Sequence, residues 1–376
     1  MRICIISRTF PPTICGVGDY SYWLANTLES LNNEITVITT NKTDDEKINV
    51  VSIGENWNIL KLHRILSIIR SVNPDFVIIQ YVCQLYGTAG IIPNIVLLVF
   101  LLKLKFKSIT LVITFHELWI PLTFKDFILG VIQRLEAGFI VLMADTSIIT
   151  TNTREQALKK LFSRAKIYKI PVGSNIPSKG KLSLSLHYLK KDFTLGTFGR
   201  LHPERDLITI IRAIKIITAR KYNVTLKIIG KIDQGIIYTT LLREIKDLGI
   251  EKNIIWTDSC SAEEIEKHIT NSDIYLSPEI DGASGRRGAL MAALSLGVPI
   301  IAYGGKDTEK IFENGENIIL IPPRNPDILA QRIIELANDE KRRIILGERA
   351  LDTFQKYFSW EIIGRNYEEI FQSFFK

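Results

Sequence analysis

Short apolar segments alternate with longer amphipathic segments along almost the whole chain, and this alternation strongly constrains the fold. Near-continuous hydrophobic runs of strand length are typical of strands buried on both faces in a parallel sheet. The stretches between them are long enough to hold the helices that parallel strands require. The predicted strands are Arg2–Ser7, Glu34–Thr40, Asp75–Gln80, Ile109–Phe115, Ser147–Thr150, Phe193–Arg200, Leu226–Gly230, Ile254–Trp256, Ile274–Pro278 and Pro299–Tyr303. We therefore expect an α/β protein with doubly wound parallel sheets.

The chain is long enough for two domains. Its 376 residues exceed the roughly 250–300 residues at which a single hydrophobic core stops growing. The segment IPVGSNIPSKGKLSLS, which begins at Ile170, has the proline, glycine and serine content of a linker, and the strand pattern restarts after it. We expect two Rossmann-like domains, over residues 1–180 and 190–355, that face each other across a cleft.

The net positive charge lies in the first half. Up to Lys181 there are 20 Lys and Arg residues against 13 Asp and Glu, whereas the remainder holds 27 of each, for a formal net charge of +7. This surplus favours an anionic partner for the first domain, either a phosphorylated acceptor or an anionic membrane surface, although solvated lysines alone explain it as well. Because no compact basic block is interleaved with aromatic residues, we expect no nucleic-acid partner.

Cysteine use and the first residues point to the cytoplasm. Cys4, Cys15, Cys83 and Cys260 are scattered, with no paired spacing and no histidine at metal-ligand spacing, so we expect reduced thiols and no metal site. The N-terminal segment MRICIIS is a predicted strand, without the regions of a secretory signal. We expect a cytoplasmic protein.

The most hydrophobic stretch is Ile91–Lys107. Its uninterrupted apolar run, Ile95–Leu102, is far shorter than the roughly 20 residues needed to span a bilayer. Two readings remain: a helix buried beside the following strand, or a helix resting on a membrane with Lys103, Lys105 and Lys107 among the headgroups. The later segment LWIPLTFKDFILGVI would extend the same apolar, basic surface.

Two motifs mark the expected ligand edge of the first sheet. Gly16, Gly18 and Asp19 lie between the first strand and a helix, where glycines let a substrate approach the backbone. His116 comes just past the carboxyl end of a strand, where doubly wound sheets bind their ligands, although a lone histidine also suits a structural role. We treat these four residues as candidate site residues.

The second half carries two further motifs. In GRLHPER, Arg200 follows a strand and Arg205 precedes a helix, where the pair could bind a diphosphate or be solvated. The segment from Asp273 to Tyr303 reads as a strand, a glycine-rich turn, a helix and a second strand. Arginines beside the N–H groups of a helix start suit a phosphate, and the alternative is a tight turn with solvated arginines. The candidate residues of this loop are Asp281, Ser284, Gly285, Arg286, Arg287 and Gly288.

Taken together, these stretches resemble the retaining GT-B glycosyltransferases of family 4, which transfer a sugar from a nucleotide diphosphate sugar. The resemblance covers essentially the whole chain. FPPTICGVGDYSYWLANTL resembles the N-terminal glycine loop, ITFHE the segment of the active-site histidine, and GRLHPER the G-R-L-x-x-x-K element with Arg205 in place of lysine. SPEIDGASGRRGALMAALSLGVPII resembles the nucleotide-sugar element. FSWEIIGRNYEEIF resembles the last helix, which implies that residues 356–376 cross back to the first domain.

The nucleotide-sugar element departs from the family in one respect. Most members carry two glutamates in it, whereas here Asp281 stands near the earlier position, in a longer loop, and Ala292 stands at the later one. The chain is similar in this to a bacterial subgroup with a D-G-x-S-x-R-R-G loop. In that subgroup the paired arginines would take over part of the diphosphate binding.

The resemblance implies hexose transfer from a UDP- or GDP-linked sugar to a glycan or lipid-linked acceptor in cell-surface polysaccharide synthesis. It implies no metal or other cofactor, in agreement with the absence of a D-x-D pair. A lipid-linked acceptor would place the protein at the inner face of the membrane, in contact through its first domain.

Each candidate residue has an expected role. Arg200, Arg205, Arg286, Arg287 and the helix end at Gly288 would stabilise the leaving diphosphate. Asp281 would hold sugar hydroxyls, His116 would contact the sugar, and Gly16, Gly18 and Asp19 would line the cleft. Two alternatives stay open: a non-catalytic subunit that binds a nucleotide or a partner enzyme, suggested by Ala292 and Arg205, and a nucleotide-sugar epimerase.

Overall fold

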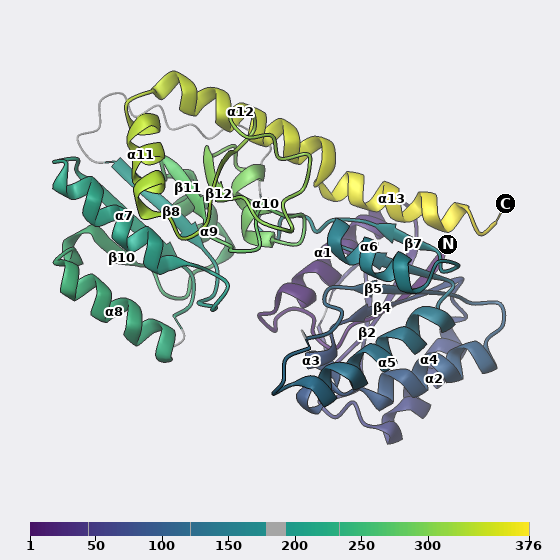
Figure 1. Cartoon of the computed structure of the whole chain (residues 1–376). Helices are drawn as coiled ribbons and strands as arrows, with labels where there is room; N and C mark the ends of the chain where they lie inside the picture. Colours follow the sequence, from purple (N-terminus) through teal and green to yellow (C-terminus); the bar gives the residue numbers. More distant parts are fainter. Residues whose placement is uncertain (44, 121, 178–192, 233, 376) are drawn as a thin grey trace. The chain divides into compact units, whose positions relative to one another are not determined.

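The structure is a computed structural model that describes residues 1–376 except 44, 121, 178–192, 233 and 376. The chain divides into two compact units (Figure 1). Unit 1 holds Met1–Asn175 and Trp360–Lys376, and unit 2 holds Ile176–Ser359. The boundary expected near residue 180 and the serine-rich part of the expected linker lie outside the described residues. Each unit is built on a parallel sheet with helices, so the predicted fold class is confirmed.

Unit 1 contains a seven-stranded sheet among its described residues. Its strands are β1 (Arg2–Ile6), β2 (Glu34–Thr39), β3 (Asn49–Ser52), β4 (Phe76–Tyr81), β5 (Thr110–Phe115), β6 (Thr146–Ile149) and β7 (Ile167–Lys169). Its helices are α1 (Gly16–Ser30), α2 (Leu62–Val72), α3 (Cys83–Tyr86), α4 (Pro93–Lys105), α5 (Phe127–Met143), α6 (Asn152–Leu161) and α13 (Trp360–Gln372), with short 3₁₀ turns at Ile59–Lys61 and Thr88–Gly90.

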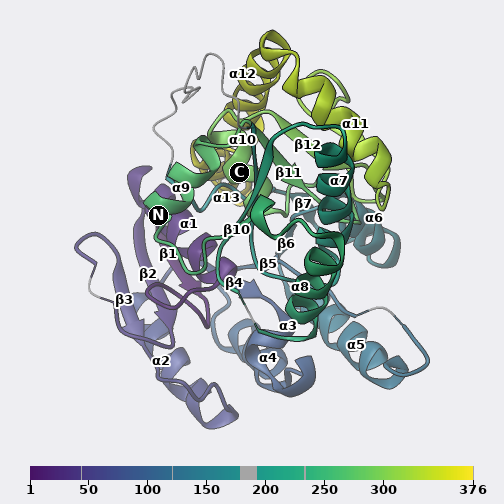
Figure 2. The same ribbon diagram turned by 90° about the vertical axis from the view of Figure 1, so that its left-hand side faces the viewer.

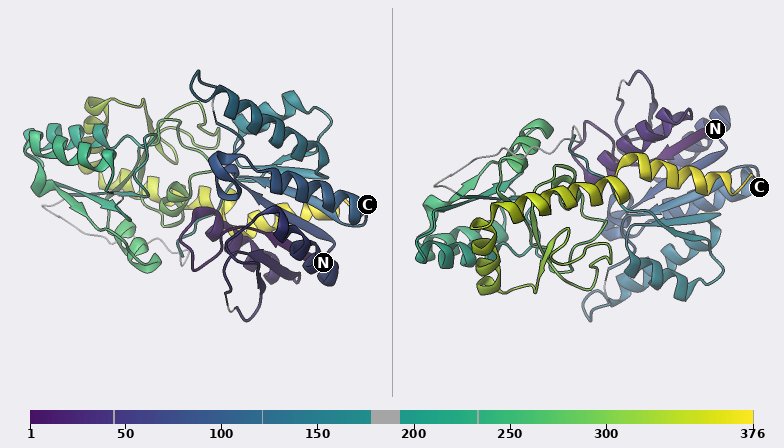
Figure 3. Two further views of the ribbon diagram at one scale, coloured as in Figure 1. Left: turned by 90° about the horizontal axis from the view of Figure 1, so that it is seen from below. Right: turned by 90° about the horizontal axis from the view of Figure 1, so that it is seen from above.

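The strand order of this sheet is β3-β2-β1-β4-β5-β6-β7, and all the pairs are parallel. The order reverses between β1 and β4, and a doubly wound sheet opens its ligand crevice beyond the carboxyl ends of the strands at such a reversal. Helices α2, α4 and α5 cover one face of the sheet, and α1 and α13 cover the other (Figures 1 and 3). All six residues of β4 are buried, as expected for a central strand.

Unit 2 contains a six-stranded parallel sheet among its described residues, in the order β10-β9-β8-β11-β12-β13. Its strands are β8 (Phe193–Phe198), β9 (Val224–Ile229), β10 (Ile254–Trp256), β11 (Ile274–Ser277), β12 (Ile300–Tyr303) and β13 (Ile319–Ile321). Its helices are α7 (Leu207–Ala219), α8 (Ile236–Leu248), α9 (Ala262–Thr270), α10 (Gly288–Ser295), α11 (Pro326–Ala337) and α12 (Glu340–Tyr357), with a 3₁₀ turn at Glu251–Asn253. Helices α7, α8 and α11 pack over one face of the sheet, with α9 and α10 on the other (Figure 2). The order of this sheet reverses between β8 and β11.

The sequence pattern missed three strands, β3, β7 and β13. All three lie at the edge of a sheet. β3 and β7 are partly exposed and contain polar residues, and β13 is apolar but only three residues long, so none of them shows the longer buried run of a central strand. Among the described residues, no helix has the length and apolar character to cross a membrane.

Helix α13 is anchored in unit 1 by aromatic side chains. The indole N–H of Trp360 donates to the carbonyl of Ser174 at 2.7 Å. The hydroxyl groups of Tyr367 and Tyr20 share a buried hydrogen bond of 3.0 Å. Gly364 allows the helix to approach α1 closely, because a β-carbon there would lie 2.5 Å from a methyl group of Thr27. The last helix therefore belongs to the hydrophobic core of unit 1.

Replacing Trp360 by alanine should destabilise unit 1, because it removes a large side chain that is only 9% exposed, together with its hydrogen bond to the Ser174 carbonyl. We expect a loss of about 3–5 kcal/mol in the free energy of unfolding. Urea titration of the full chain would measure it. Leu161→Ala, at an exposed position of the same unit, should change stability by less than about 0.5 kcal/mol. Equal effects of the two substitutions would contradict the anchoring role.

Candidate functional site

In unit 1 the glycine loop leads from β1 into α1, at the reversal of the strand order. Gly16 is the first residue of α1 and is exposed, with open space where a β-carbon would stand. Gly18 is buried, and a β-carbon there would lie 3.1 Å from the backbone carbon of Thr9. The two glycines thus differ: Gly18 allows the helix to pack on its own loop, and Gly16 leaves the helix start accessible.

Asp19 lies in the first turn of α1 and is partly buried. Burial raises the pKa of its carboxyl group to about 6, although a hydrogen bond with the side chain of Asn175 acts in the opposite direction. The carboxyl group can therefore change its protonation state near neutral pH, which a solvated aspartate does not do.

His116 directly follows β5, with its backbone N–H bonded to the carbonyl of Tyr81 at the end of β4. Its ring meets the ring of Tyr20 edge to face, with the centroids 4.8 Å apart. Burial and the neighbouring charge of Arg154 lower the pKa of the imidazole to about 3. His116 is therefore neutral at physiological pH. It can donate or accept a hydrogen bond, but it adds no positive charge to the site.

Gln80 fixes the orientation of this imidazole, and the sequence analysis did not single it out. Nε2 of His116 lies 2.8 Å from Oε1 of Gln80, whose side chain is fully buried. The amide oxygen accepts, so this geometry assigns the proton to Nε2 and leaves Nδ1 as an acceptor. The rule that selected His116, a polar residue at the carboxyl end of a strand, applies equally to Gln80.

In unit 2 the residues after β8 form the first side of the site. Gly199 adopts a φ of +128°, which favours glycine. Arg200 follows it and is exposed. Arg205, by contrast, is buried: its guanidinium donates to the carbonyl of Gly199 at 2.6 Å and to the hydroxyl of Thr197 at 2.6 Å.

Arg205 also forms a buried ion pair. Its Nε lies 3.7 Å from Oε1 of Glu279, and both side chains are at most 10% exposed. The backbones of the same residues pair as an isolated antiparallel bridge. Arg205 thus joins the loop after β8 to the loop after β11. The structure gives it a supporting position inside the site wall, and the diphosphate contact expected for it remains a prediction.

The loop after β11 brings Asp281 against both arginines of the motif. One carboxylate oxygen of Asp281 accepts from Arg287 at 2.5 Å, and the other accepts from Arg286. Burial alone would raise the pKa of Asp281, but the hydrogen bonds and charges of Arg287 and Arg286 outweigh it and hold that pKa below its ordinary value. Glu204 lies 3.4 Å from Arg287 and Asp307 lies 4.0 Å from Arg286. The arginines are thus held side by side within a cluster of carboxylates.

The glycines of this loop have separate roles. Gly282 has a φ of +103°, and a β-carbon there would lie 2.6 Å from the backbone nitrogen of Gly305. The N–H of Gly285 donates at 2.8 Å to Glu309, a buried carboxylate that the sequence analysis did not find. Ser284 is fully buried, and its hydroxyl has no hydrogen-bond partner among the described residues. The Nε atoms of Arg286 and Arg287 are likewise buried and without a hydrogen-bond partner among the described residues.

Helix α10 begins at Gly288, with Arg287 as its N-cap residue and no side-chain cap. The N–H groups of a first helical turn have no intrahelical partners, and they carry partial positive charge. Ala292 is fully buried in the same helix, so its position offers no polar contact. This corner of unit 2 therefore combines two arginines with a helix start, an arrangement that suits a diphosphate.

The structure brings the expected residues together in two groups, one in each unit. Gly16, Gly18, Asp19 and His116 lie in unit 1, and the others lie in unit 2 at the reversal between β8 and β11. Among the described residues no group of histidine, cysteine or carboxylate side chains has a geometry that could hold a metal ion.

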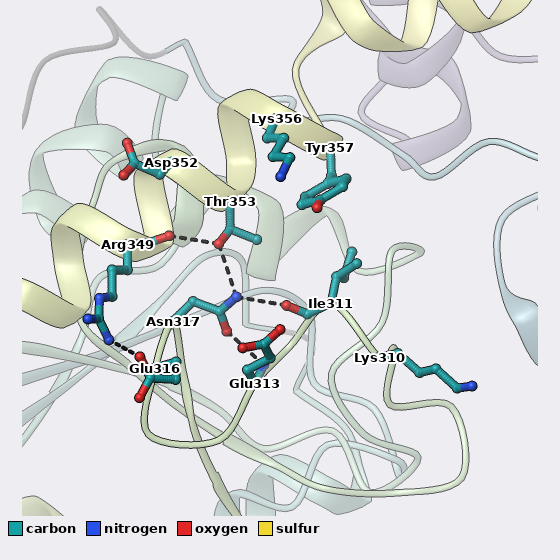
Figure 4. A pocket seen from close by; sticks show the side chains of 10 residues that line it. All are labelled: Lys310, Ile311, Glu313, Glu316, Asn317, Arg349, Asp352, Thr353, Lys356 and Tyr357. Carbon is teal, nitrogen blue, oxygen red and sulfur yellow. Dashed lines mark hydrogen bonds and ion pairs between the residues drawn. The ribbon is translucent and has the colours of Figure 1, made fainter.

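A cavity of about 430 Å³ lies elsewhere in unit 2, between α12 and residues 310–317 (Figure 4). Several of its polar groups bond to one another: Arg349 pairs with Glu316, and Asn317 donates to the carbonyl of Ile311 at 2.7 Å and to the hydroxyl of Thr353 at 3.1 Å. It contains none of the residues that the sequence analysis selected.

Replacing Gln80 by glutamate should place a carboxylate beside Nε2 of His116 and favour the imidazolium. The pKa of His116 should rise by at least about 1 unit. In the parent protein the folded-state pKa lies below the unfolded value, so His116 contributes stability that is lost as pH falls from about 6.5 toward 3. In Gln80→Glu this loss should shrink. Nuclear magnetic resonance titration of the ring protons would measure the pKa. Gln84→Glu, at a nearby exposed position, is the control and should leave it unchanged.

Replacing Arg205 by methionine should destabilise unit 2 by about 3–5 kcal/mol, because it leaves Glu279 buried without its counter-ion. Arg286→Met should cost clearly less, since Arg287 still neutralises Asp281. Urea titration of both variants would compare them. A larger loss in Arg286→Met would contradict the supporting position of Arg205.

Comparison with known proteins agrees with this geometry. Residues 185–353 match the family described as "Glycosyl transferases group 1". The capsular polysaccharide biosynthesis glycosyltransferase CapM of Staphylococcus aureus is 24% identical over 204 residues, which cover 52% of this chain and 50% of CapM. A GDP-mannose-dependent phosphatidylinositol monomannoside mannosyltransferase of Mycobacterium tuberculosis is 22% identical over 187 residues, 47% of this chain and 48% of that protein. The chain thus spans about half the length of the curated relatives it matches.

Solved structures match the whole chain. The sucrose-phosphate synthase of Thermosynechococcus elongatus has a TM-score of 0.78 at 15% identity, covering 100% of this chain and 99% of that one. The HepE protein of Anabaena in complex with UDP and glucose has a TM-score of 0.72 at 16% identity, covering 99% of this chain and 100% of that one. These likenesses, together with the two parallel sheets, show that the chain has the GT-B fold, and the family match over residues 185–353 supports a glycosyltransferase.

Proposed function

We propose that this protein is a retaining glycosyltransferase of the family 4 type, which moves a hexose from a UDP- or GDP-linked sugar to a glycan or lipid-linked acceptor in cell-surface polysaccharide synthesis. The observation that carries this proposal is the pair Arg286 and Arg287 at the start of α10. The pair lies at the reversal of the sheet order, inside the segment that matches the glycosyltransferase family.

The positive charge of the arginine pair is complementary to the negative charge that develops on the leaving group. When the anomeric carbon–oxygen bond of the donor breaks, negative charge grows on the departing nucleotide diphosphate. Arg286 and Arg287 would share this charge with the N–H groups of the first turn of α10. Since both guanidinium groups already have their places fixed by Asp281, little reorganisation is needed in the transition state. These groups stabilise the leaving group without a divalent ion, and we propose that none is required.

The other candidate residues take roles that fit their surroundings. Arg200, exposed after β8, would contact the diphosphate, and Arg205 would hold its loop in place. Ser284, with its buried and unpaired hydroxyl, would bond to the donor. The neutral His116 would accept a hydrogen bond from a sugar hydroxyl through Nδ1, because Nε2 is bonded to Gln80.

Asp281 has a role different from the one its sequence position suggests. Both of its carboxylate oxygens accept from arginines, so it orders the arginine pair in the structure without a donor. Holding sugar hydroxyls would require it to release at least one arginine. We propose that donor binding makes this exchange, in which diphosphate oxygens replace one of the Asp281 contacts.

The relatives support the chemical class of donor and leave its base open. HepE of Anabaena has been solved with UDP-glucose, whereas the mannosyltransferase of Mycobacterium tuberculosis is named as GDP-mannose-dependent. CapM belongs by its name to capsular polysaccharide biosynthesis. A sugar linked to a nucleoside diphosphate is common to the two named donors.

The reaction can be tested by incubating the purified protein, with EDTA present, against a panel of UDP-, GDP- and ADP-sugars and measuring the nucleotide released. We expect release from one donor. Arg286→Ala should lower that release about 10²-fold, because it removes one cation from the leaving group. Arg243→Ala, at an exposed position on α8, should leave it unchanged. If Arg286→Ala released nucleotide as fast as the parent protein, Arg286 would not stabilise the leaving diphosphate.

A non-catalytic subunit that binds a nucleotide or a partner enzyme is the second candidate. It is favoured by the buried Ala292 and by the ion pairs that both arginines form with Asp281. Thermal shifts separate the two candidates: stabilisation by UDP or GDP without nucleotide release from any donor would support the binding subunit. Absence of both signals would count against the enzyme and the nucleotide-binding subunit alike.

A further inference from the structure

Unit 1 is electrically polarised across its sheet. The helical layer on one face, here called the basic layer, comprises residues 59–72, 93–107 and 122–143, with α2, α4 and α5. It holds eight Lys and Arg residues against two Asp and Glu, a surplus that is close to the net charge of the whole chain. On the opposite face, α1 and α13 hold five Asp and Glu residues against one arginine. The basic layer is therefore net positive, and the helices on the opposite face are net negative.

The basic layer also exposes an unusual share of large apolar side chains. It carries ten of the eighteen large hydrophobic residues that are exposed among the described residues. These ten are Ile59, Leu60, Phe100, Leu104, Leu122, Phe124, Phe127, Ile128, Leu135 and Leu142. Scattered exposed leucines are ordinary, but a concentration on one helical layer marks an interaction surface.

Helix α5 shows this most clearly, because it is apolar on two faces. One face buries Gln133, Ala137 and Ile140 against the sheet. Ile128, Leu135 and Leu142 recur every seven residues, two helical turns apart, and are 76%, 69% and 69% exposed. A helix at a water-exposed protein surface normally has a polar outer face, and α5 does not.

Charge and exposure together indicate the kind of partner. Lys105 and Lys107 lie at the end of α4, and Lys125 stands next to Phe124, whose side chain is completely exposed. The two acidic residues of the layer, Asp126 and Glu136, are partly buried. Lysine is depleted in protein interfaces, whereas lysines around apolar side chains are typical of surfaces that rest on anionic lipid. Their long stems can lie along apolar surface with the ammonium group at the headgroups.

The basic layer reaches the edge of the sheet where the candidate residues lie. His116 follows β5, and the next segment of the chain runs directly to α5. Phe124 and Phe127 lie on that connection, at the start of α5. A partner that bound Phe124 and Phe127 would therefore lie beside the edge of the sheet that carries His116.

We propose that the basic layer of unit 1 docks on an anionic lipid bilayer, with the apolar side chains of α4, α5 and residues 122–128 inserted among the acyl chains near the headgroups. Basic side chains of α2 and of the end of α4 bind the lipid phosphates. The docking itself does not rest on the proposed function. Only its consequence does: the ligand edge of unit 1 would meet an acceptor carried by a lipid.

The docking can be measured by co-sedimentation of the full chain with vesicles of phosphatidylcholine alone and of phosphatidylcholine mixed with phosphatidylglycerol. We expect binding to the mixed vesicles at low salt, little binding to the neutral ones, and release in about 0.5 M NaCl. No binding to the mixed vesicles would overturn the proposal. No nucleotide sugar is added, so this result is independent of whether the protein transfers a sugar.

Two pairs of substitutions separate the charge from the apolar contacts. Lys105→Glu with Lys107→Glu should weaken binding by at least about tenfold. Phe124→Ser with Ile128→Ser should weaken it by a similar factor and leave the thermal unfolding temperature unchanged, since both side chains are exposed. The matched controls lie in unit 2: Lys246→Glu with Lys252→Glu, and Ile236→Ser, all at exposed positions. Control variants that lose binding as strongly as the unit 1 variants would overturn the assignment to this layer.

The remaining possibility is that the same apolar side chains join two copies of the chain. Sedimentation velocity without lipid distinguishes it. A dimer that becomes monomeric in Phe124→Ser with Ile128→Ser would make the layer a protein interface and contradict the lipid proposal. A monomeric parent that binds the mixed vesicles supports it.

Discussion

The buried ion pair between Arg205 and Glu279 connects the two loops on which the candidate donor site of unit 2 is built. Residues 204–206 and 278–280 pair along their backbones at this point, with the N–H of Asp206 bonded to the carbonyl of Pro278 and that of Ile280 bonded to the carbonyl of Glu204. The loops follow β8 and β11, the two strands between which the sheet order reverses. A buried pair of this kind is costly to break from one side, because the partner keeps its charge without a counter-ion. The pair therefore fixes the separation of the loops, and through it the position of Arg286 and Arg287.

Three carboxylate side chains lie close to Arg286 and Arg287. Asp281 joins them, and Glu204 and Asp307 lie within 4.0 Å. This arrangement keeps two guanidinium groups side by side, which their mutual repulsion would otherwise oppose. A diphosphate arriving at the start of α10 would meet cations already in place, and it would exchange with carboxylates instead of ordering flexible side chains. The candidate residues of unit 1 form no such cluster of charges. His116 is neutral, and burial raises the pKa of Asp19 to about 6.

The polarity of unit 1 adds a second constraint. Residues that cover one face of its sheet are basic and expose apolar side chains, whereas those on the other face are acidic and hold α13 in the core. Sequence analysis found the surplus of charge in the first half and left two readings for Ile91–Lys107, a buried helix or a helix at a membrane. The structure shows that α4 buries Ile95, Leu98 and Val99 and exposes Phe100 and Leu104. The buried face of α4 agrees with the first reading, and contact of its exposed face with a membrane stays a proposal.

The sequence by itself determined the fold class and the central strands, because a strand buried on both faces must be apolar along its whole length. It did not determine β3, β7 and β13, since short edge strands carry no such requirement. Gly16, His116, Arg286 and Arg287 could be selected because their motifs are local: a glycine before a helix, or a polar residue after a strand. Their roles remain predictions. Only the tertiary structure decided that Arg205 is buried against Glu279, that Asp281 holds both arginines, and that Gln80 orients His116. Most of these partners lie on different loops or strands, so the contacts that set charge and orientation exist only once the sheets are assembled.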